Sequence, residues 1–169
     1  MISKATLNDA AALVQLVNSA YRGEKSKQGW TTEADLLDGE LRTDEADLKE
    51  LLNKTDSRFL KFTLDGKIRG CVYLQKQADK MYLGMLSVSP AAQASGIGKQ
   101  FLSASEKFAL GQGCHFIIMN VISIRHELIN WYERHGYIQT GITNPFPTDT
   151  KFGTPKLPIE FVVLEKKLV

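Results

Sequence analysis

The sequence predicts one α/β (α+β) domain over residues 1–169. Three observations lead to this fold class: strand-like and helix-like patterns alternate along the chain, two strand patterns meet at a hairpin signal, and a glycine-rich turn joins a strand to a helix. A chain of this length can bury one sizeable core. Its apolar content of 43% and charged content of 24% are those of an ordinary globular protein.

The first expected elements are a short strand at residues 2–5 and a helix that extends to Tyr21. The apolar residues of the helix recur at three- and four-residue spacing. Thr6 and Asp9 have the spacing of a capping box, which favours a helix start at this point.

The segment after this helix is polar and rich in turn signals. Residues 22–32 are bounded by glycine and are expected to form a loop. Short helical turns are expected at residues 33–37 and 44–52, the second capped by Thr43.

Three consecutive strands are expected next. Strands are expected at residues 58–64 and 67–76, and Asp65-Gly66 between them is a strong signal for a two-residue hairpin. The third strand, residues 81–88, is closed by Pro90, which cannot donate to a ladder. The remaining elements are a helix at 97–110, a strand at 115–121, a helix at 126–134, and strands at 137–143 and 160–167 around a Pro-rich insert at 144–158.

The most informative segment is the turn of residues 93–99, which leads into the second long helix. A helix start has backbone N–H groups without intrahelical partners, and Gly96 and Gly98 leave room for a ligand against the backbone. This pattern fits an anion cradle for a phosphate, and a tight turn that binds nothing is the equally open alternative. A P-loop is excluded because Gln100 follows Lys99, and a dinucleotide fingerprint is excluded because its third glycine position is Phe101.

Two motifs resemble those of the GCN5-related N-acetyltransferase (GNAT) family. Gln93-Ala94-Ser95-Gly96-Ile97-Gly98 is similar to that family's pyrophosphate loop, and Trp131-Tyr132-Glu133-Arg134-His135-Gly136-Tyr137 resembles its Leu-Tyr-Glu-Lys-x-Gly-Phe. The order of elements also matches, so the resemblance covers nearly the whole chain. It implies a mixed, mostly antiparallel sheet of about seven strands flanked by helices and splayed between the strands near residues 81–88 and 115–121.

The resemblance implies an N-acetyltransferase that uses acetyl-CoA as co-substrate and lets a primary amine attack it directly. Tyr132 matches a tyrosine that protonates the leaving thiolate, and a phenol of pKa near 10 suits a thiol of pKa about 8.5. Arg125 stands where relatives often carry an asparagine that contacts the cofactor arm. Its side chain is expected either to contact a phosphate or to face solvent, and the sequence favours neither. The residues expected to contact the cofactor are Leu86, Ser87, Val88, Gln93, Ala94, Ser95, Gly96, Ile97, Gly98, Lys99 and Arg125.

The acceptor and the general base are less well defined. Trp30 and Glu33 are the candidate acceptor-binding residues, and a Trp30 that only anchors its loop to the core is the alternative. Some family members carry a carboxylate base on the strand before the glycine loop, but residues 81–88 contain none. Glu33, Asp35 and Glu127 are candidates for a base that acts through water, but a solvated surface acid is the favoured interpretation of each, so no base is assigned. The acceptor is expected to be a small-molecule or peptide amine, closed in by the 144–158 insert.

Composition excludes several other classes. A net charge of +2 without a basic run argues against nucleic acid, and no apolar stretch is long enough to span a bilayer. The start of the chain lacks the apolar core of a signal peptide, so a cytoplasmic protein is expected. Two cysteines are expected to be buried thiols, and the spacing of the three histidines favours no metal site.

Several alternatives stay open. A GNAT-like domain that binds acyl-CoA only as a sensor or interaction module is the second functional hypothesis. Another kind of nucleotide-phosphate binder is the third. Monomer and homodimer are both compatible with the sequence.

Overall fold

The computed structural model describes residues 1–169, and its centre is a seven-stranded sheet in the order β1-β3-β4-β5-β6-β9-β7. All neighbouring strands are antiparallel except β5 and β6, which are parallel. This confirms the predicted fold class. The strands are β1 (Ile2–Lys4), β3 (Ser57–Leu64), β4 (Lys67–Gln77), β5 (Lys80–Val88), β6 (Phe116–Ile122), β7 (Ile138–Pro145) and β9 (Glu160–Lys167), and β2 (Leu37–Asp38) pairs separately with β8 (Thr154–Pro155).

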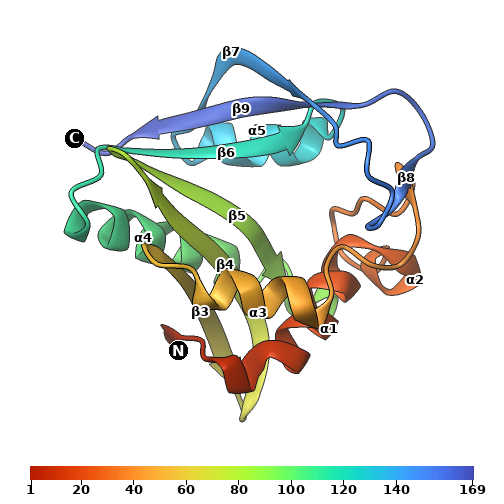
Figure 1. The fold of residues 1–169 in the computed structure, drawn as a ribbon, viewed down its shortest axis with the longest axis horizontal. Helices are drawn as coiled ribbons and strands as arrows, with labels where there is room; N and C mark the ends of the chain where they lie inside the picture. Colours follow the sequence, from red (N-terminus) through yellow and green to blue (C-terminus); the bar gives the residue numbers. More distant parts are fainter.

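Helices cover both faces of the sheet (Figure 1). On one face, α1 and α3 pack against β3 and β4, and on the other face α4 and α5 pack against the middle of the sheet. None of the helices is long and apolar enough to cross a membrane. The helices are α1 (Ala10–Tyr21), α2 (Gly23–Ser26), α3 (Glu45–Asn53), α4 (Ile97–Gly111) and α5 (His126–Arg134), with 3-10 turns η1 (Leu7–Asp9) and η2 (Pro90–Ala92).

The two faces hold two separate hydrophobic cores. Along β4, Cys71 and Tyr73 belong to the core under α1 and α3, whereas Val72 and Leu74 belong to the core under α4 and α5. Successive side chains of a strand point to opposite faces, so one strand contributes to both cores.

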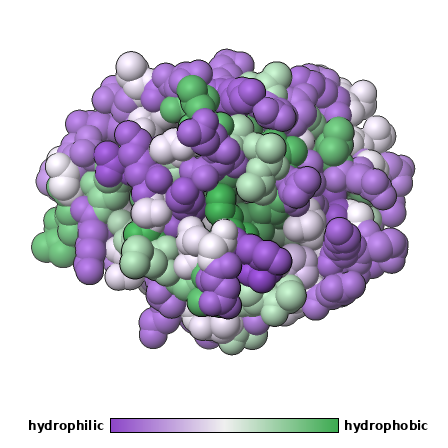
Figure 2. Space-filling view, turned by 90° about the horizontal axis from the view of Figure 1, so that it is seen from below, coloured by the Kyte–Doolittle hydropathy of each residue, from purple (hydrophilic) through white to green (hydrophobic).

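Seen from below, the outer surface is mostly hydrophilic, with hydrophobic colour in small patches and in a recess near its centre (Figure 2).

The predicted meander and its hairpin are confirmed. Asp65 and Gly66 have φ of +52° and +73°, the two positive values that a type I′ turn needs between β3 and β4. Thr6 and Asp9 also interact as expected, since the Thr6 N–H donates to Asp9 Oδ2 at 2.8 Å.

The segment between α1 and α3 departs from the prediction. The expected loop contains the short helix α2, and residues 33–37 make only one turn, in which the Leu37 N–H donates to the Glu33 carbonyl at 3.1 Å. Leu37 then pairs with Pro155, more than a hundred residues away, which no local pattern reveals. The cap of α3 is Asp44, whose carboxylate accepts from the Asp47 N–H at 2.8 Å, and not Thr43.

The pairing of β5 with β6 is short, and this positions the candidate site. It comprises three pairs, from Lys80–Phe116 to Tyr82–Ile118, after which the two strands diverge (Figure 1). A register shift in the β4–β5 ladder and a φ of +51° at Met85 mark a bulge in the diverging half of β5. The predicted splay between these strands is therefore confirmed.

Gly70 allows β4 to approach α4 closely. A Cβ at this position would lie 2.6 Å from Phe101 Cε2 and 3.1 Å from the Ser87 carbonyl oxygen. We therefore expect Gly70→Ala to lower the free energy of unfolding by about 1–3 kcal/mol, measured by urea denaturation.

Gly111→Ala is the matched control for this substitution. A Cβ at Gly111 has no neighbour within 4 Å, and the residue lies at the end of α4. We expect this variant to be as stable as the wild type or more stable by up to about 1 kcal/mol. Equal stability of the two variants would contradict the tight approach at Gly70.

Candidate active site

Two cavities meet at the C-terminal end of β5. The first, here called the α4 cavity, has a volume of about 320 Å³ and lies between residues 86–88, the start of α4 and Trp131. The second, here called the splay cavity, has a volume of about 240 Å³ and lies between the diverging halves of β5 and β6. The residues that line both cavities are Tyr21, Leu86, Arg125, Leu128 and Tyr132. Two ligands could therefore touch at this junction.

The start of α4 faces the α4 cavity with free backbone donors. Gly96 precedes the helix with a φ of +86°, and its carbonyl accepts the first intrahelical bond from Gln100 at 3.1 Å. The N–H groups of the three residues between them have no acceptor within the helix. A Cβ at Gly96 would have no neighbour within 4 Å, so the space is open. Together with Lys99 in the lining, this geometry fits a bound phosphate group.

The residues expected to contact the cofactor come together here. The lining of the α4 cavity includes Leu86, Ser87, Val88, Gln93, Ala94, Gly96, Ile97, Gly98, Lys99 and Arg125. Ser95 is not part of this lining, and its hydroxyl donates to the Ala92 carbonyl.

Gln93 ties the glycine turn to the segment after α2. Its Nε2 donates to the Val88 carbonyl at 3.0 Å, and its Oε1 accepts from the Trp30 N–H at 2.9 Å. The Trp30 ring lies 6.2 Å from the Trp131 ring, centroid to centroid. Trp30 therefore borders the α4 cavity, whereas Glu33, the other residue expected to bind the acceptor, lines the splay cavity.

Tyr132 of α5 lies at the junction. Its side chain is buried and its hydroxyl has no hydrogen-bond partner within the protein. Desolvation raises the pKa of Tyr132 well above its ordinary value of 10.0, and the nearby Tyr21 and Tyr137 raise it further. The phenol is therefore protonated at neutral pH and can donate a hydrogen bond or a proton into either cavity.

Tyr21 makes a second contact at this junction. Its hydroxyl donates to the Leu86 carbonyl at 2.9 Å, beside the bulge of β5. Burial raises the pKa of Tyr21 to about 12, so this donor keeps its proton. The Leu86 carbonyl therefore has a hydrogen-bond donor, although β5 no longer pairs with β6 at this position.

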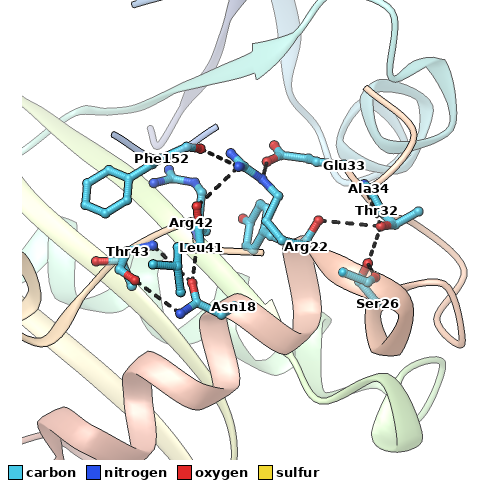
Figure 3. Close-up of polar contacts among 12 residues, drawn as sticks. Asn18, Arg22, Ser26, Thr32, Glu33, Ala34, Leu41, Arg42, Thr43 and Phe152 are labelled. Carbon is cyan, nitrogen blue, oxygen red and sulfur yellow. Dashed lines mark hydrogen bonds and ion pairs between the residues drawn. The ribbon is translucent and has the colours of Figure 1, made fainter. Parts of the chain in front are cut away.

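Glu33 is buried, which contradicts its expected exposure to solvent, and Arg125, for which exposure was one of two open alternatives, is buried beside it. Glu33 Oε1 accepts from Arg22 Nε at 3.0 Å and Oε2 accepts from Arg125 Nη1 at 3.3 Å, and the three side chains are only 3–8% exposed. Arg22 also donates to the carbonyls of Leu41 and Phe152 (Figure 3). The carboxylate is buried because it pairs with two guanidinium groups, which no surface acid would need.

The other two acids considered as bases lie outside the cavities. The Asp35 side chain is 76% exposed, and that of Glu127 is 46% exposed and accepts from the Thr31 hydroxyl at 3.0 Å. The two cysteines are buried and free, as predicted. No group of three or more His, Cys, Asp or Glu side chains could hold a metal ion.

Three further residues of the site were not predicted from the sequence: Tyr21, Arg22 and Arg42, which all line the splay cavity. Tyr21 ends the apolar face of a helix and has the pattern of a core residue. The ion pair of Arg22 with Glu33 spans eleven residues, and its contact with Phe152 spans 130. No spacing rule connects positions so far apart.

A comparison with known families identifies the chain. Residues 13–137 match the model of the acetyltransferase (GNAT) family, which covers more than half of the chain. The chain belongs to this family. This confirms the resemblance carried by the glycine turn and the Trp131–Tyr137 motif, and it confirms the predicted enzyme class, an acyltransferase.

Solved structures agree with this GNAT fold. The PaiA N-acetyltransferase from Thermoplasma acidophilum, in complex with coenzyme A, has a TM-score of 0.75 at 20% identity and covers 99% of this chain and 98% of its own. The ribosomal-protein-S18-alanine N-acetyltransferase from Escherichia coli has a TM-score of 0.74 at 14% identity. The match covers 99% of this chain and 93% of that protein. An aminoglycoside 6′-N-acetyltransferase complexed with coenzyme A has a TM-score of 0.72 at 14% identity. The match covers 100% of this chain and 97% of that protein. No curated protein sequence matches significantly.

The buried carboxylate gives a stability prediction for this GNAT protein. Glu33→Gln leaves two buried guanidinium groups without their shared negative charge. We expect a loss of about 3–5 kcal/mol in the free energy of unfolding, measured by urea denaturation. Glu24→Gln is the matched control, because Glu24 is 91% exposed and pairs only with Lys27, and it should change stability by less than about 1 kcal/mol. A small effect at Glu33 would show that the two arginines do not depend on it.

Proposed function

We propose that this protein transfers the acetyl group of acetyl-CoA to a primary amine. The observation that carries this proposal is the junction of the two cavities at Tyr132 and Leu86. A donor in one cavity and an acceptor in the other would meet there, so the amine can attack the acetyl group directly. The coenzyme A present in two of the similar structures supports the choice of donor.

The α4 cavity is the proposed site for acetyl-CoA. The free N–H groups at the start of α4 and the Lys99 ammonium would hold the pyrophosphate, and residues 86–88 would run beside the pantetheine arm. When bound, acetyl-CoA supplies a thioester carbonyl for attack and a thiolate as the leaving group.

Tyr132 is the proposed general acid. Its phenol is protonated at neutral pH and has no partner within the protein, so it can give its proton to the departing sulfur. The attacking nitrogen loses one proton, and the Tyr132 phenolate takes up this proton, directly or through water. The two transfers together restore the enzyme.

No residue is proposed as the general base. Glu33 lines the splay cavity, but both of its oxygens already accept hydrogen bonds from arginines. The residues 81–88 contain no carboxylate. The acceptor would therefore bind as the free amine, and the one proton that its nitrogen loses after the attack would return to Tyr132, directly or through water.

One prediction of the proposed function concerns the binding of acetyl-CoA. At a concentration about 100 times Kd, a ligand adds about 2.7 kcal/mol, which for a chain of this size raises Tm by about 5–10 °C. We expect this shift with acetyl-CoA and not with NAD or ATP, measured by thermal unfolding. Lys99→Glu should weaken acetyl-CoA at least about tenfold by losing a charged contact.

Lys107→Glu is the matched charge reversal, since Lys107 is exposed on the same helix and lies outside both cavities. It should leave acetyl-CoA binding unchanged. An absence of stabilisation by any coenzyme A species would contradict both the enzyme and the sensor hypotheses.

The second prediction concerns Tyr132. Tyr132→Phe should lower kcat by about 10²–10⁴-fold in a thiol-release assay over a panel of amines, because the leaving group loses its proton donor. Because the pKa of Tyr132 is raised, the phenol keeps its proton at every pH below about 10. In that range the wild-type kcat should therefore not fall through ionisation of Tyr132.

Tyr137→Phe is the matched control. The Tyr137 hydroxyl is buried without a hydrogen-bond partner and lines neither cavity, so this variant should keep the wild-type kcat. Equal turnover by Tyr132→Phe and the wild type would remove Tyr132 from the acid role. Binding of acetyl-CoA without thiol release for any amine would favour the sensor hypothesis instead.

A further inference from the structure

The lining of the splay cavity carries more positive than negative charge. Its cationic residues are Arg22, Arg42, Arg125 and Lys151, and its anionic residues are Glu33 and Asp149. Glu33 is shared between Arg22 and Arg125. Lys151 pairs with Asp44 and Asp47 at the start of α3. Arg42 is left without an anionic partner.

Arg42 is an oriented cation, although its guanidinium has no ion pair or hydrogen bond within the protein. Its backbone N–H donates to Asn18 Oδ1 at 2.6 Å, and the neighbouring Thr43 is bound by the same amide at 3.0 and 3.1 Å. Its guanidinium carbon lies 5.6 Å from the centroid of the Tyr21 ring. Both its backbone and its head group are therefore held while its N–H donors stay free.

The guanidinium groups of Arg42 and Arg22 lie next to each other beside Phe152 (Figure 3). Arg22 is already engaged by Glu33 and by two carbonyls, whereas the donors of Arg42 are free for a ligand. Arg125, by contrast, pairs with Glu33 and Glu127, and only its buried Nε has no hydrogen-bond partner. Half-buried cations held close together attract an anion into the space between them.

We propose that the acceptor is a small amine that also carries an acidic group, and that Arg42 binds this group. The inference rests on the proposed acetyl transfer and names the substrate class of the same site. A planar guanidinium presents paired donors that match a carboxylate or a phosphate. The amine at the other end of the acceptor points toward the junction at Tyr132.

The walls of the cavity restrict the acceptor further. The insert closes it with Phe146 and Phe152, and the Phe152 carbonyl is fixed by Arg22. A volume of about 240 Å³ is small for a ligand site, which suits a compact molecule. A polycationic amine would meet the positive lining with like charge. The acceptor class is therefore a small amino acid-like compound with an apolar body.

The test compares amines that differ only in the acidic group. Thiol release is measured with amino carboxylates, their carboxamides, their phosphonate analogues and polyamines, with rates expressed per free amine. We expect the acidic amines to exceed the carboxamides at least tenfold in kcat/KM, and the carboxylate and phosphonate arms identify the preferred acid. Arg42→Gln should remove this preference mainly by raising KM at least tenfold, and Arg42→Lys should restore part of it.

Arg134→Gln is the matched control, because Arg134 is exposed on α5 and lines neither cavity. It should keep the preference, and an unchanged thermal shift with acetyl-CoA shows that each variant is folded. Efficient acetylation of carboxamides or polyamines over acidic amines, or an unchanged preference in Arg42→Gln, would overturn the inference and leave acetyl transfer standing. Absence of thiol release with every amine would overturn both.

Discussion

The early end of the β5–β6 ladder is the constraint on which the rest of this structure depends. Parallel strands that paired along their whole length would leave no space between them, but these two separate after three pairs. A bulge at Met85 lies in the diverging half of β5, and the separation of the strands leaves room for the splay cavity. Separation also leaves backbone groups without strand partners, which must be satisfied in another way. Tyr21 supplies one such partner to the Leu86 carbonyl.

The shared carboxylate of Glu33 organises the other wall of the site. It links Arg22 at the end of α1 to Arg125 at the start of α5, and Arg22 in turn holds Phe152 of the insert. Removing three charges from water is costly, so such a network adds little net stability over an apolar packing. What it gives is position. The segment that carries Trp30 and Arg42 is held beside the two cavities by this network and by contacts with Gln93 and Asn18.

Much of the fold could be predicted because the signals are local. Apolar alternation located β5, and Asp65-Gly66 located the hairpin of β3 and β4, since each signal depends on a few neighbouring residues. The glycine turn at the start of α4 and the end of α5 are local signals too, from glycines at fixed spacing and from a helix-ending motif, whereas the roles expected for them came from the family resemblance. The region between α1 and α3 was predicted less well. There the structure depends on β8 and on Phe152, which are more than a hundred residues away.

The sequence by itself determined the order of the elements, the glycine turn at the start of α4 and the tyrosine of α5. These depend on spacing within one or two turns of chain, and the family match agrees with them. Only the tertiary structure decided which charges are buried and which are free. Glu33 has the pattern of a surface acid, yet it lies between two arginines, while Arg42 has no partner and lines a cavity. Charge pairing is a property of distance in space, and the chain brings these residues together only when the sheet is complete.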